Sequence, residues 1–443
     1  MTHAVYIKTF GCQMNVEDSR QMMGLLKLLG CNQVDDVYQA DIVILNTCSI
    51  RAKAEHKIYS ELGRLKRLKE DKDLIICVAG CVAEQEEKSI IKRFPFVDIV
   101  MGPDQVGFLP ELVTSCLKDR DTPPKKTYRK TGFQLKDDYQ FLHVMPEQKE
   151  VSVKAFVNIQ KGCDNFCAYC IVPHVRGREA SRPSTQIIDE IKSLTQLGVR
   201  EVTLLGQNVN SYGLKENNDI TFAQLLERIA SQTELKRLRF ATSHPRDVSD
   251  ALIEQFASNP ILAPHFHLPL QSGSDRILKL MNRGYTRKHY LTIVEKLKKQ
   301  NSHLCFSTDL IVGFPSETNQ EFEDTLSVMK DVNFVQTYSF IYSPRPHTSA
   351  ARMPDDVLLK EKQMRLKRLQ DLDSEITLKQ NHSDVGTVRY VLVEAVQQEN
   401  QKPFMGRTEH NKIVHFTSKN VYHPGDFARV TISQANPHSL FGE

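Results

Sequence analysis

Three cysteines stand close together in the segment KGCDNFCAYCIVP, spaced as C-x3-C-x2-C. They are Cys163, Cys167 and Cys170, and they follow a short β-branched run, AFVNIQ. Three thiolates on one irregular loop can bind three irons of a 4Fe-4S cluster, and the missing fourth ligand leaves one iron open to a small molecule. Structural zinc is the alternative, but it usually takes four ligands and only His174 is near enough to be the fourth.

A second set of cysteines is spread more widely along the chain. Cys12, Cys48 and Cys81 lie about one strand-helix unit apart, and each follows the end of a predicted strand. The carboxyl ends of neighbouring parallel strands meet at one edge of a sheet, where ligand sites of open α/β domains form. This shared placement predicts a second metal site. The other cysteines lack it and are expected to be core or incidental thiols: Cys31, Cys77, Cys116 and Cys305.

The segments that must position these cysteines show three patterns. Up to about residue 115, the runs VYIKTF, DIVILNT, LIICVAG and VDIVMG alternate with charged amphipathic stretches, which predicts an open parallel α/β domain. From residue 153, six further strand-helix units predict a barrel or a large part of one, with an open doubly wound sheet as the alternative. The last about 60 residues alternate with period 2, which predicts a small β-barrel.

Changes in composition set the expected domain boundaries. We expect domains at residues 1–118, 149–378 and 379–443, and a charged helix from about Asp355 to Lys379 that ends the second of them. Between the first two domains, residues 119–148 carry prolines and mixed charge. This composition argues against a packed element and predicts a linker.

Composition also limits the class of protein. Hydrophobic residues make up 40% of the 443 residues, enough for several cores. The apolar runs fall short of the about 18 to 20 residues that a membrane span needs, and MTHAVYIKTFG lacks the features of a signal sequence. We therefore expect a soluble cytoplasmic protein whose cysteines are mostly reduced. The net charge of +4 alone does not indicate nucleic-acid binding.

Seven motifs together resemble the methylthiotransferase family, and its MiaB branch in particular. The motifs are KTFGCQMN, NTCSIRAKAEHK, GCVAEQ, KGCDNFCAYCIVPHVRGREASR, LLGQNVNSYG, LPLQSGSDRILKLMNRGYT and DLIVGFPSET. The resemblance covers almost the whole chain. It implies an amino-terminal cluster domain, a radical S-adenosylmethionine core built as a partial (β/α)6 TIM-like barrel, and a carboxyl-terminal RNA-binding TRAM barrel.

The resemblance also implies the chemistry. Two 4Fe-4S clusters are expected, one at each cysteine set, together with two uses of S-adenosylmethionine. One molecule donates a methyl group to sulfur at the cluster of Cys12, Cys48 and Cys81. The other is cleaved at the cluster of Cys163, Cys167 and Cys170, and its radical removes hydrogen from carbon 2 of N6-isopentenyladenosine beside the anticodon of a transfer RNA. An electron donor such as a flavodoxin or ferredoxin and an unidentified sulfur source are expected as partners.

Further residues are implied to bind S-adenosylmethionine. Tyr169 matches the family position that packs near the adenine, and the others follow the second, fourth and fifth barrel strands: Gly206, Gln207, Asn208, Gln271, Ser272 and Gly313. The alternatives are ordinary turn residues and helix caps, which applies also to Ser274 and Glu317. No catalytic side chain is expected beyond the clusters, because the cofactors supply the difficult chemistry.

Two other functions stay open. One is a sister methylthiotransferase that acts on threonylcarbamoyl adenosine or on a ribosomal-protein aspartate, which the KTFGCQMN context argues against. The other is a non-catalytic iron-sulfur sensor that binds RNA. In the carboxyl-terminal barrel, basic residues and aromatic residues interleave, which fits either an RNA groove with stacking rings or a solvated charged face. These residues are Lys402, Arg407, Lys412, Lys419, Arg429, Phe404, Phe416 and Tyr422.

Overall fold

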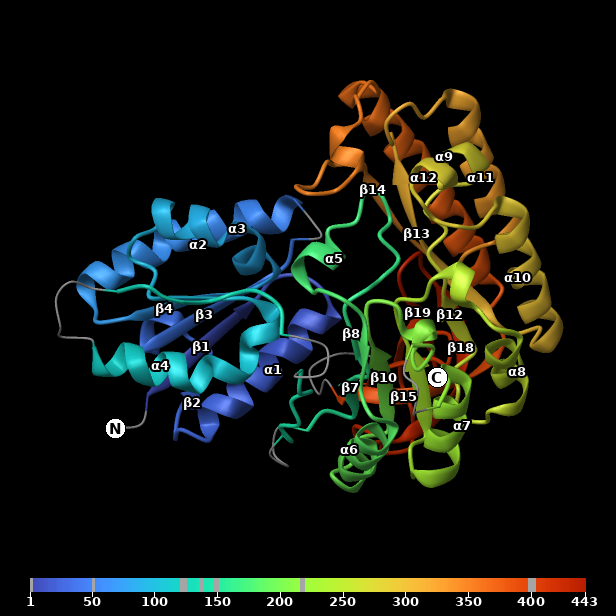
Figure 1. The fold of residues 1–443 in the computed structure, drawn as a ribbon. Coiled ribbons are helices and arrows are strands. Elements are labelled where there is room, and N and C mark those ends of the chain that lie inside the picture. Colours follow the sequence, from blue (N-terminus) through green and yellow to red (C-terminus); the bar gives the residue numbers. More distant parts are fainter. Residues whose placement is uncertain are drawn as a thin grey trace. The chain divides into compact units, whose positions relative to one another are not determined.

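The computed structural model describes residues 3–49, 52–119, 126–134, 139–146, 151–215, 220–396 and 404–443. The chain divides into two compact units (Figure 1). Unit 1 comprises Met1–Glu150, Gln160–Phe166 and Cys170–Arg182. Unit 2 comprises Val151–Ile159, Cys167–Tyr169 and Pro183–Glu443. Among the helices of the described ranges, none has the length and apolar character needed to cross a membrane.

Unit 1 is built on a parallel sheet. In spatial order its strands are β2 (Asn32–Gln33), β1 (Ala4–Thr9), β3 (Ile42–Thr47), β4 (Ile75–Gly80), β5 (Ile99–Met101) and β6 (Tyr128–Lys130). Every neighbouring pair is parallel. The two central strands β3 and β4 are buried along their whole length, which explains why their sequences are almost continuously apolar.

Helices cover both faces of this sheet (Figure 1). α1 (Gln13–Lys27) and α4 (Leu109–Lys118) pack on one face, and α2 (Ala52–Asp71) and α3 (Cys81–Arg93) on the other. Two short turns of helix, η1 (Val37–Gln39) and η2 (Pro103–Phe108), complete the connections. The helix after β1, α1, lies on one face of the sheet, and the helix after β3, α2, lies on the other. The chain therefore changes face between β1 and β3. Open α/β sheets bind ligands at such a switch point, beyond the carboxyl ends of the strands.

The segment expected to be a linker contributes to unit 1. The prediction that residues 119–148 hold no packed element is wrong for Tyr128–Lys130, which forms the edge strand β6 beside β5. The main-chain N–H of Gly132 donates to the Glu84 carboxylate at 2.9 Å, and Arg20 donates to Val144 O at 2.6 Å. A three-residue edge strand is too short to produce a period-2 pattern among prolines and charges.

A small hairpin returns to unit 1 from the cysteine loop. β8 (Gln160–Lys161) pairs with β9 (Ala180–Ser181), and α5 (Val172–Val175) lies between them along the chain. The Lys161 ammonium is buried 2.5 Å from the Asp104 carboxylate and 3.5 Å from the centre of the Tyr139 ring. These contacts join the hairpin to η2 of the same unit.

Unit 2 begins with six parallel strands. They are β7 (Lys154–Asn158), β10 (Glu201–Leu205), β11 (Arg237–Phe240), β12 (His265–His267), β13 (Cys305–Val312) and β14 (Gln336–Ile341). Two three-stranded sheets, β11-β10-β7 and β12-β13-β14, are connected by a parallel bridge between Leu238 and Leu262. This is the partial (β/α)6 barrel expected from the sequence.

Helices follow the barrel strands, as the predicted strand-helix units require. They are α6 (Ser184–Gln196), α7 (Phe222–Gln232), α8 (Asp250–Ser258), α9 (Asp275–Leu280), α10 (Arg287–Gln300), α11 (Asn319–Val332) and α12 (Leu359–His382), with short turns η5 (Val209–Ser211), η6 (Pro245–Asp247) and η7 (Ala350–Arg352). Hydroxyl side chains cap several of these helices by accepting an N–H of the first turn. The caps are Thr221, Ser249, Ser274, Thr286 and Thr318.

The last strands close into a small barrel, as the sequence predicts. Its order is β15 (Val388–Val396), β16 (Phe404–Arg407), β17 (Ile413–Phe416), β19 (Leu440–Gly442) and β18 (Phe427–Ala435). The idea that Phe404 and Phe416 stack on RNA is wrong, because their rings are buried inside this barrel and stack on each other at 5.2 Å. Tyr422 packs edge-on against Phe404. Lys402 lies outside the described residues.

A buried charged group joins the two parts of unit 2. Glu201 from β10 pairs with Arg239 from β11 at 3.0 Å. Arg237, also on β11, donates to Arg407 O and Tyr390 O of the small barrel, each at 3.1 Å. Arg239 donates to Thr408 O at 2.9 Å. β11 thereby supplies hydrogen-bond donors for main-chain carbonyls of the carboxyl-terminal barrel, and Glu201 of β10 supplies the carboxylate that pairs with Arg239.

We predict that Arg237→Ala lowers the free energy of unfolding by about 3 kcal/mol, because it removes one partner of a buried charge group and leaves carbonyls without donors. Urea denaturation followed by circular dichroism measures the change. Arg228→Ala, which removes an exposed arginine from α7, serves as the control. Equal midpoints for the two variants would contradict the proposed role of Arg237.

Candidate functional site

Cysteines follow three adjacent strands of unit 1. Cys12 is the N-cap residue of α1 after β1, Cys48 directly follows β3, and Cys81 is the first residue of α3 after β4. Because β1 pairs with β3 and β3 with β4, all in parallel, the three cysteines lie at the same edge of the sheet. Cys12 and Cys48 flank the point at which the chain changes face.

The thiols of this set differ in their electrostatic surroundings. The hydrogen bond from the Cys48 thiol, opposed by burial and assisted by Arg176, lowers the pKa of Cys12 to about 6. Burial raises the pKa of Cys81, and the Arg176 charge opposes this rise. The Cys12 thiolate is therefore favoured at neutral pH, and a thiolate is the form that binds metal.

Polar main-chain contacts fix the strand ends that carry these cysteines. Asn15 Nδ2 donates to Asn46 Oδ1 at 3.2 Å and to Thr47 O at 3.1 Å, and Asn46 Nδ2 donates to Asn15 O at 2.8 Å. Gly80 has a φ of +91°, and a Cβ there would lie 2.5 Å from Thr47 O. Glycine before Cys81 thus lets the ends of β3 and β4 approach closely.

A buried ion pair lies beside the same cysteines. Arg176 Nη2 is 2.6 Å from Asp18 Oδ2, and both side chains are buried. Ile171 and Val175, on the same segment as Arg176, pack against Cys81. The sequence analysis gave no role to Arg176 or Asp18, since a charged residue in the sequence does not show that its side chain is buried.

The chemistry of this donor set fits an iron-sulfur cluster. Three thiols share one sheet edge, and the buried Ser49 hydroxyl beside Cys48 has no hydrogen-bond partner among the described residues. Across those residues, no three Cys, His, Asp or Glu side chains stand in a ready-made metal-binding arrangement. The three thiols therefore fit a cluster by their chemical type and by their shared place at one edge of the sheet.

The C-x3-C-x2-C loop is divided between the two units. Cys163 and Cys170 fall in unit 1, where both are half-buried, and Cys167 falls in unit 2. Gly162 has a φ of +70°, and a Cβ there would lie 2.0 Å from Arg178 O. The Cys163 N–H donates to Gly177 O at 3.3 Å. The start of the loop is held by main-chain contact with the residues before β9.

In unit 2 the middle cysteine lies against a buried arginine. Arg283 Nη1 is 3.2 Å from Cys167 Sγ and 3.5 Å from the Tyr169 hydroxyl. The Tyr169 ring packs on an apolar cluster that includes Ile277 and Phe314. Arg283 stands in the motif LMNRGYT, far from the cysteines in sequence, and the sequence analysis did not identify it.

Several residues implied to bind S-adenosylmethionine lie at the carboxyl ends of barrel strands. Gly206, Gln207 and Asn208 directly follow β10, and Asn208 Nδ2 donates to Asp247 Oδ2 at 2.7 Å. Gln271 extends the strand region after β12, where its main chain pairs with Leu310 of β13. Its φ of +73° is unusual for a residue with a side chain and is a form of strain common at functional sites.

Other residues at this edge have structural partners. Ser272 is fully buried and its hydroxyl accepts the Ser274 N–H at 3.2 Å, while Ser274 caps α9. The Gly313 N–H donates to Glu317 Oε2 at 2.7 Å, and Glu317 pairs with Arg365 at 2.8 Å. The capping interpretation therefore holds for Ser274, and Glu317 stabilises the turn after β13.

Buried polar atoms without hydrogen-bond partners gather after the same strands. Within the described ranges these atoms are Asn208 Oδ1 after β10, Ser243 Oγ and His244 Nε2 after β11, and Tyr342 Oη after β14. Burial lowers the pKa of His244 to about 2, so its ring is neutral. Native proteins seldom leave such atoms unsatisfied. Their placement fits a polar ligand, a class that includes S-adenosylmethionine.

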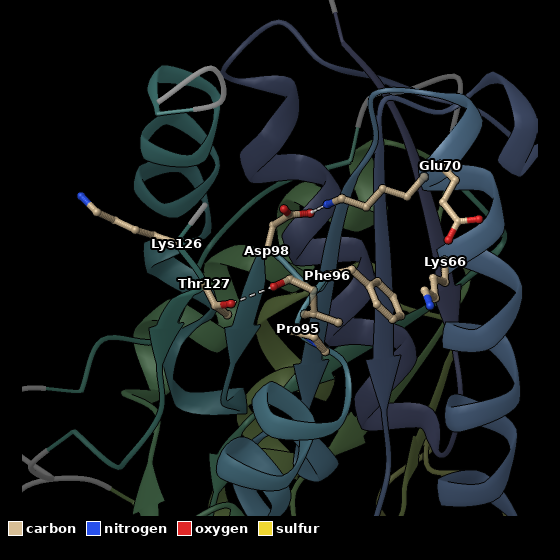
Figure 2. Close-up of a pocket in the computed structure, with 9 residues that line it drawn as sticks. Lys66, Glu70, Pro95, Phe96, Asp98, Lys126 and Thr127 are labelled. Carbon is tan, nitrogen blue, oxygen red and sulfur yellow. Dashed lines mark hydrogen bonds and ion pairs between the residues drawn. The ribbon is translucent and has the colours of Figure 1, made fainter. Parts of the chain in front are cut away.

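A surface pocket elsewhere in unit 1 is unrelated to the cysteines. It has a volume of about 160 Å³ and is lined by residues that include Lys66, Phe96 and Lys126. The Lys69 ammonium pairs with the Asp98 carboxylate, which Figure 2 shows among the residues that line the pocket. Asp98 and Thr127 precede β5 and β6, so the pocket lies at the amino ends of the strands, opposite the edge that carries the cysteines.

Three known families match successive parts of the chain. Residues 4–102 match the family described as Uncharacterized protein family UPF0004, residues 157–329 the Radical SAM superfamily, and residues 382–443 the TRAM domain. The Radical SAM superfamily match implies a 4Fe-4S cluster and S-adenosylmethionine as cofactors.

Full-length relatives share one name. The protein called tRNA-2-methylthio-N(6)-dimethylallyladenosine synthase from Geobacter metallireducens is 47% identical over 99% of this chain and 98% of its own length. Proteins with the same name from Syntrophotalea carbinolica and Chromobacterium violaceum are 45% and 44% identical over 99% of this chain and 99% and 98% of their own lengths.

Solved structures share the fold at low sequence identity. The radical S-adenosylmethionine methyltransferase TsrM from Kitasatospora setae aligns with a TM-score of 0.57 and 15% identity over 79% of this chain and 77% of its own. The cobalamin-dependent S-adenosylmethionine radical enzyme OxsB gives a TM-score of 0.51 and 13% identity over 85% of this chain and 56% of its own. These similarities support the architecture.

We predict that Gly11→Ala disrupts the metal site of unit 1 and that Gly30→Ala does not. Both glycines have positive φ, but a Cβ at Gly11 would lie 2.3 Å from the Cβ of Cys48, whereas nothing lies within 4 Å at Gly30. Conformational strain of about 1 kcal/mol is common to both variants.

Iron analysis after anaerobic reconstitution measures the result. Gly11→Ala is expected to lose about four of about eight irons per chain, one cluster's worth, while Gly30→Ala retains them. Equal iron in both variants would show that the space between Gly11 and Cys48 does not matter for metal binding.

Proposed function

The chain belongs to the family of the tRNA-2-methylthio-N(6)-dimethylallyladenosine synthases, and from this premise we propose that it adds a methylthio group to carbon 2 of N6-isopentenyladenosine beside the anticodon of transfer RNA. The observation that carries the proposal is identity of 42% to 47% over nearly the whole chain. The placement of both cysteine sets at strand ends supports it.

Cys163, Cys167 and Cys170 would bind a 4Fe-4S cluster through their thiolates and leave one iron open. When bound, the cluster and S-adenosylmethionine supply one-electron cleavage of a carbon-sulfur bond, giving methionine and the radical that takes hydrogen from carbon 2. The protein's part is to hold these groups in line and to exclude water. Buried Cys167 and the apolar cluster beneath Tyr169 serve that purpose.

Cys12, Cys48 and Cys81 would hold the second 4Fe-4S cluster, which would carry the sulfur to be transferred; another S-adenosylmethionine would supply its methyl group. The buried Arg176–Asp18 pair beside Cys81 and Cys12 would fix the orientation of these ligands. An external donor such as a flavodoxin or ferredoxin is proposed to supply the electron.

Contacts to S-adenosylmethionine are proposed at Tyr169, Gly206, Gln207, Asn208, Gln271, Ser272 and Gly313. Support comes from their position at the carboxyl ends of barrel strands, where sites of such folds form. The unpartnered atoms of Ser243 and His244 add candidates from β11 that the sequence analysis missed.

The carboxyl-terminal barrel is proposed to bind the transfer RNA. Phe404 and Phe416 lie inside the barrel, whereas Tyr390 on β15 is exposed, and the Arg429 guanidinium lies 5.8 Å from the centre of its ring. An aromatic ring beside an arginine suits stacking on unpaired bases. We propose domain boundaries at residues 1–118, 149–378 and 379–443, with residues 119–148 connecting the first two.

We predict that replacing each cysteine set by alanine separates the two activities. Without Cys163, Cys167 and Cys170, cleavage of S-adenosylmethionine to 5′-deoxyadenosine is abolished while about four irons remain. Without Cys12, Cys48 and Cys81, 5′-deoxyadenosine still forms but no methylthio product appears. Iron analysis and chromatography of the products test both variants. If 5′-deoxyadenosine persists in the first variant, the assignment of the loop cysteines fails.

Substrate selectivity gives a further prediction. Two anticodon stem-loops that differ only in the isopentenyl group are offered to the reconstituted enzyme, and the prenylated one should react faster. Burying five carbons contributes roughly 3 to 4 kcal/mol at most, at about 0.8 kcal/mol per CH₂ unit. The rate ratio should therefore reach about two to three powers of ten. Mass spectrometry of the nucleosides measures this rate ratio. Comparable turnover of both stem-loops would exclude the proposed binding of the prenyl group.

A further inference from the structure

Arg283 is a buried charge without a carboxylate partner. Its side chain is 4% exposed, and among the described residues no Asp or Glu lies within ion-pair distance of its guanidinium. Buried arginines are ordinarily paired with an anion, because a buried charge without a partner is strongly destabilising. The arrangement therefore requires a negative charge that none of the described carboxylates supplies.

The contacts of Arg283 indicate where that negative charge resides. Nη1 is 3.2 Å from Cys167 Sγ and 3.5 Å from the Tyr169 hydroxyl, a neutral phenol, and the other donors reach Pro269 O and the Tyr285 hydroxyl. Burial raises the pKa of Tyr285, so its phenol is neutral. Cys167 remains as the contact that becomes an anion, and it does so when its thiolate binds iron.

The guanidinium is fixed in this position from several sides. Nη2 donates to Pro269 O at 3.0 Å, Nε donates to the Tyr285 hydroxyl at 3.1 Å, and that hydroxyl donates to Leu270 O at 2.7 Å. The Ala168 N–H donates to Met281 O at 2.9 Å, which holds the two chain segments together beside the contact. Since an arginine does not lose its proton in proteins, a constant positive charge is maintained beside Cys167.

A fixed positive charge beside a cluster ligand has a predictable effect. The potential of an iron-sulfur cluster depends on its net charge and on hydrogen bonds to its sulfurs. Reduction adds one electron from the external donor and breaks no bond, so the reduced cluster is the more negative form. We propose that Arg283 is a positioning residue that stabilises this reduced form, raising the reduction potential of the cluster at Cys163, Cys167 and Cys170; the inference rests on the function proposed above.

The test uses a chain with a single cluster. In full-length protein carrying alanine at Cys12, Cys48 and Cys81, the variants Arg283→Gln and Arg283→Lys are compared with the parent. Arg287→Gln is the matched control, because it removes one positive charge four residues away on α10, where Arg287 pairs with Asp331 at 3.3 Å. Iron content and an electron paramagnetic resonance titration with dithionite as reductant are the readouts.

The expected result is a shift in potential without loss of iron. Arg283→Gln should lower the ratio of reduced to oxidised cluster at a given potential about tenfold, a midpoint shift of about 59 mV. Arg283→Lys should recover part of the shift because it keeps the charge, and Arg287→Gln should match the parent.

Each other result decides against the inference. If Arg283→Gln keeps its iron and the parent's midpoint, Arg283 does not set the potential. If both Arg283 variants lose iron while Arg287→Gln keeps it, the residue is structural only. A parent that binds no cluster and forms no 5′-deoxyadenosine would instead refute the proposed function itself, together with any inference that depends on it.

Discussion

Parallel strands bring all their carboxyl ends to one edge, and both units depend on this constraint. In unit 1 it places Cys12, Cys48 and Cys81 after three adjacent strands although they are far apart in sequence. In unit 2 it places the residues after β10, β11, β12, β13 and β14 at the corresponding edge of a partial barrel. The covering helices and their caps matter for function chiefly because they keep these strands parallel and in register.

Close approach of main chains limits which residues can stand beside the cysteines. Gly11, Gly80 and Gly162 all have positive φ, and each lies where a Cβ would overlap a neighbouring atom. Gly11 faces Cys48, Gly80 faces the end of β3, and Gly162 faces the main chain just before β9. Three glycines with one shared reason indicate that the strand ends are packed around the cysteines as closely as the main chain permits.

The sequence predicts strands and helices better than it predicts the contacts of individual side chains. Continuous apolar runs such as LIICVAG identify buried parallel strands, and the period-2 runs identify the small barrel. Edge strand β6 was missed because Tyr128–Lys130 is too short for any pattern. One of the two interpretations of the carboxyl-terminal barrel placed Phe404 and Phe416 against RNA, yet they alternate with Met405 and His415, and this alternation could have indicated that the phenylalanines point inward.

Buried arginines are harder still to predict, because the sequence shows a charge but not its depth or its partner. Arg176 and Arg283 look like any other arginines in the sequence, yet each lies beside candidate cluster cysteines of its own unit. Their surroundings differ in one respect. Arg176 is paired with Asp18 at 2.6 Å, so the field that it exerts on Cys81 and Cys12 is partly cancelled.

Arg283 has no such carboxylate among the described residues, so Cys167 experiences its charge undiminished. The two cysteine sets are thus placed in different fields by the same type of side chain. Under the proposed function, the cluster at Cys163, Cys167 and Cys170 would accept an electron in every cycle and the cluster at Cys12, Cys48 and Cys81 would hold sulfur for transfer, and different fields suit these two roles. The carboxylate partner, rather than the arginine, is then the feature that separates the two electrostatic environments.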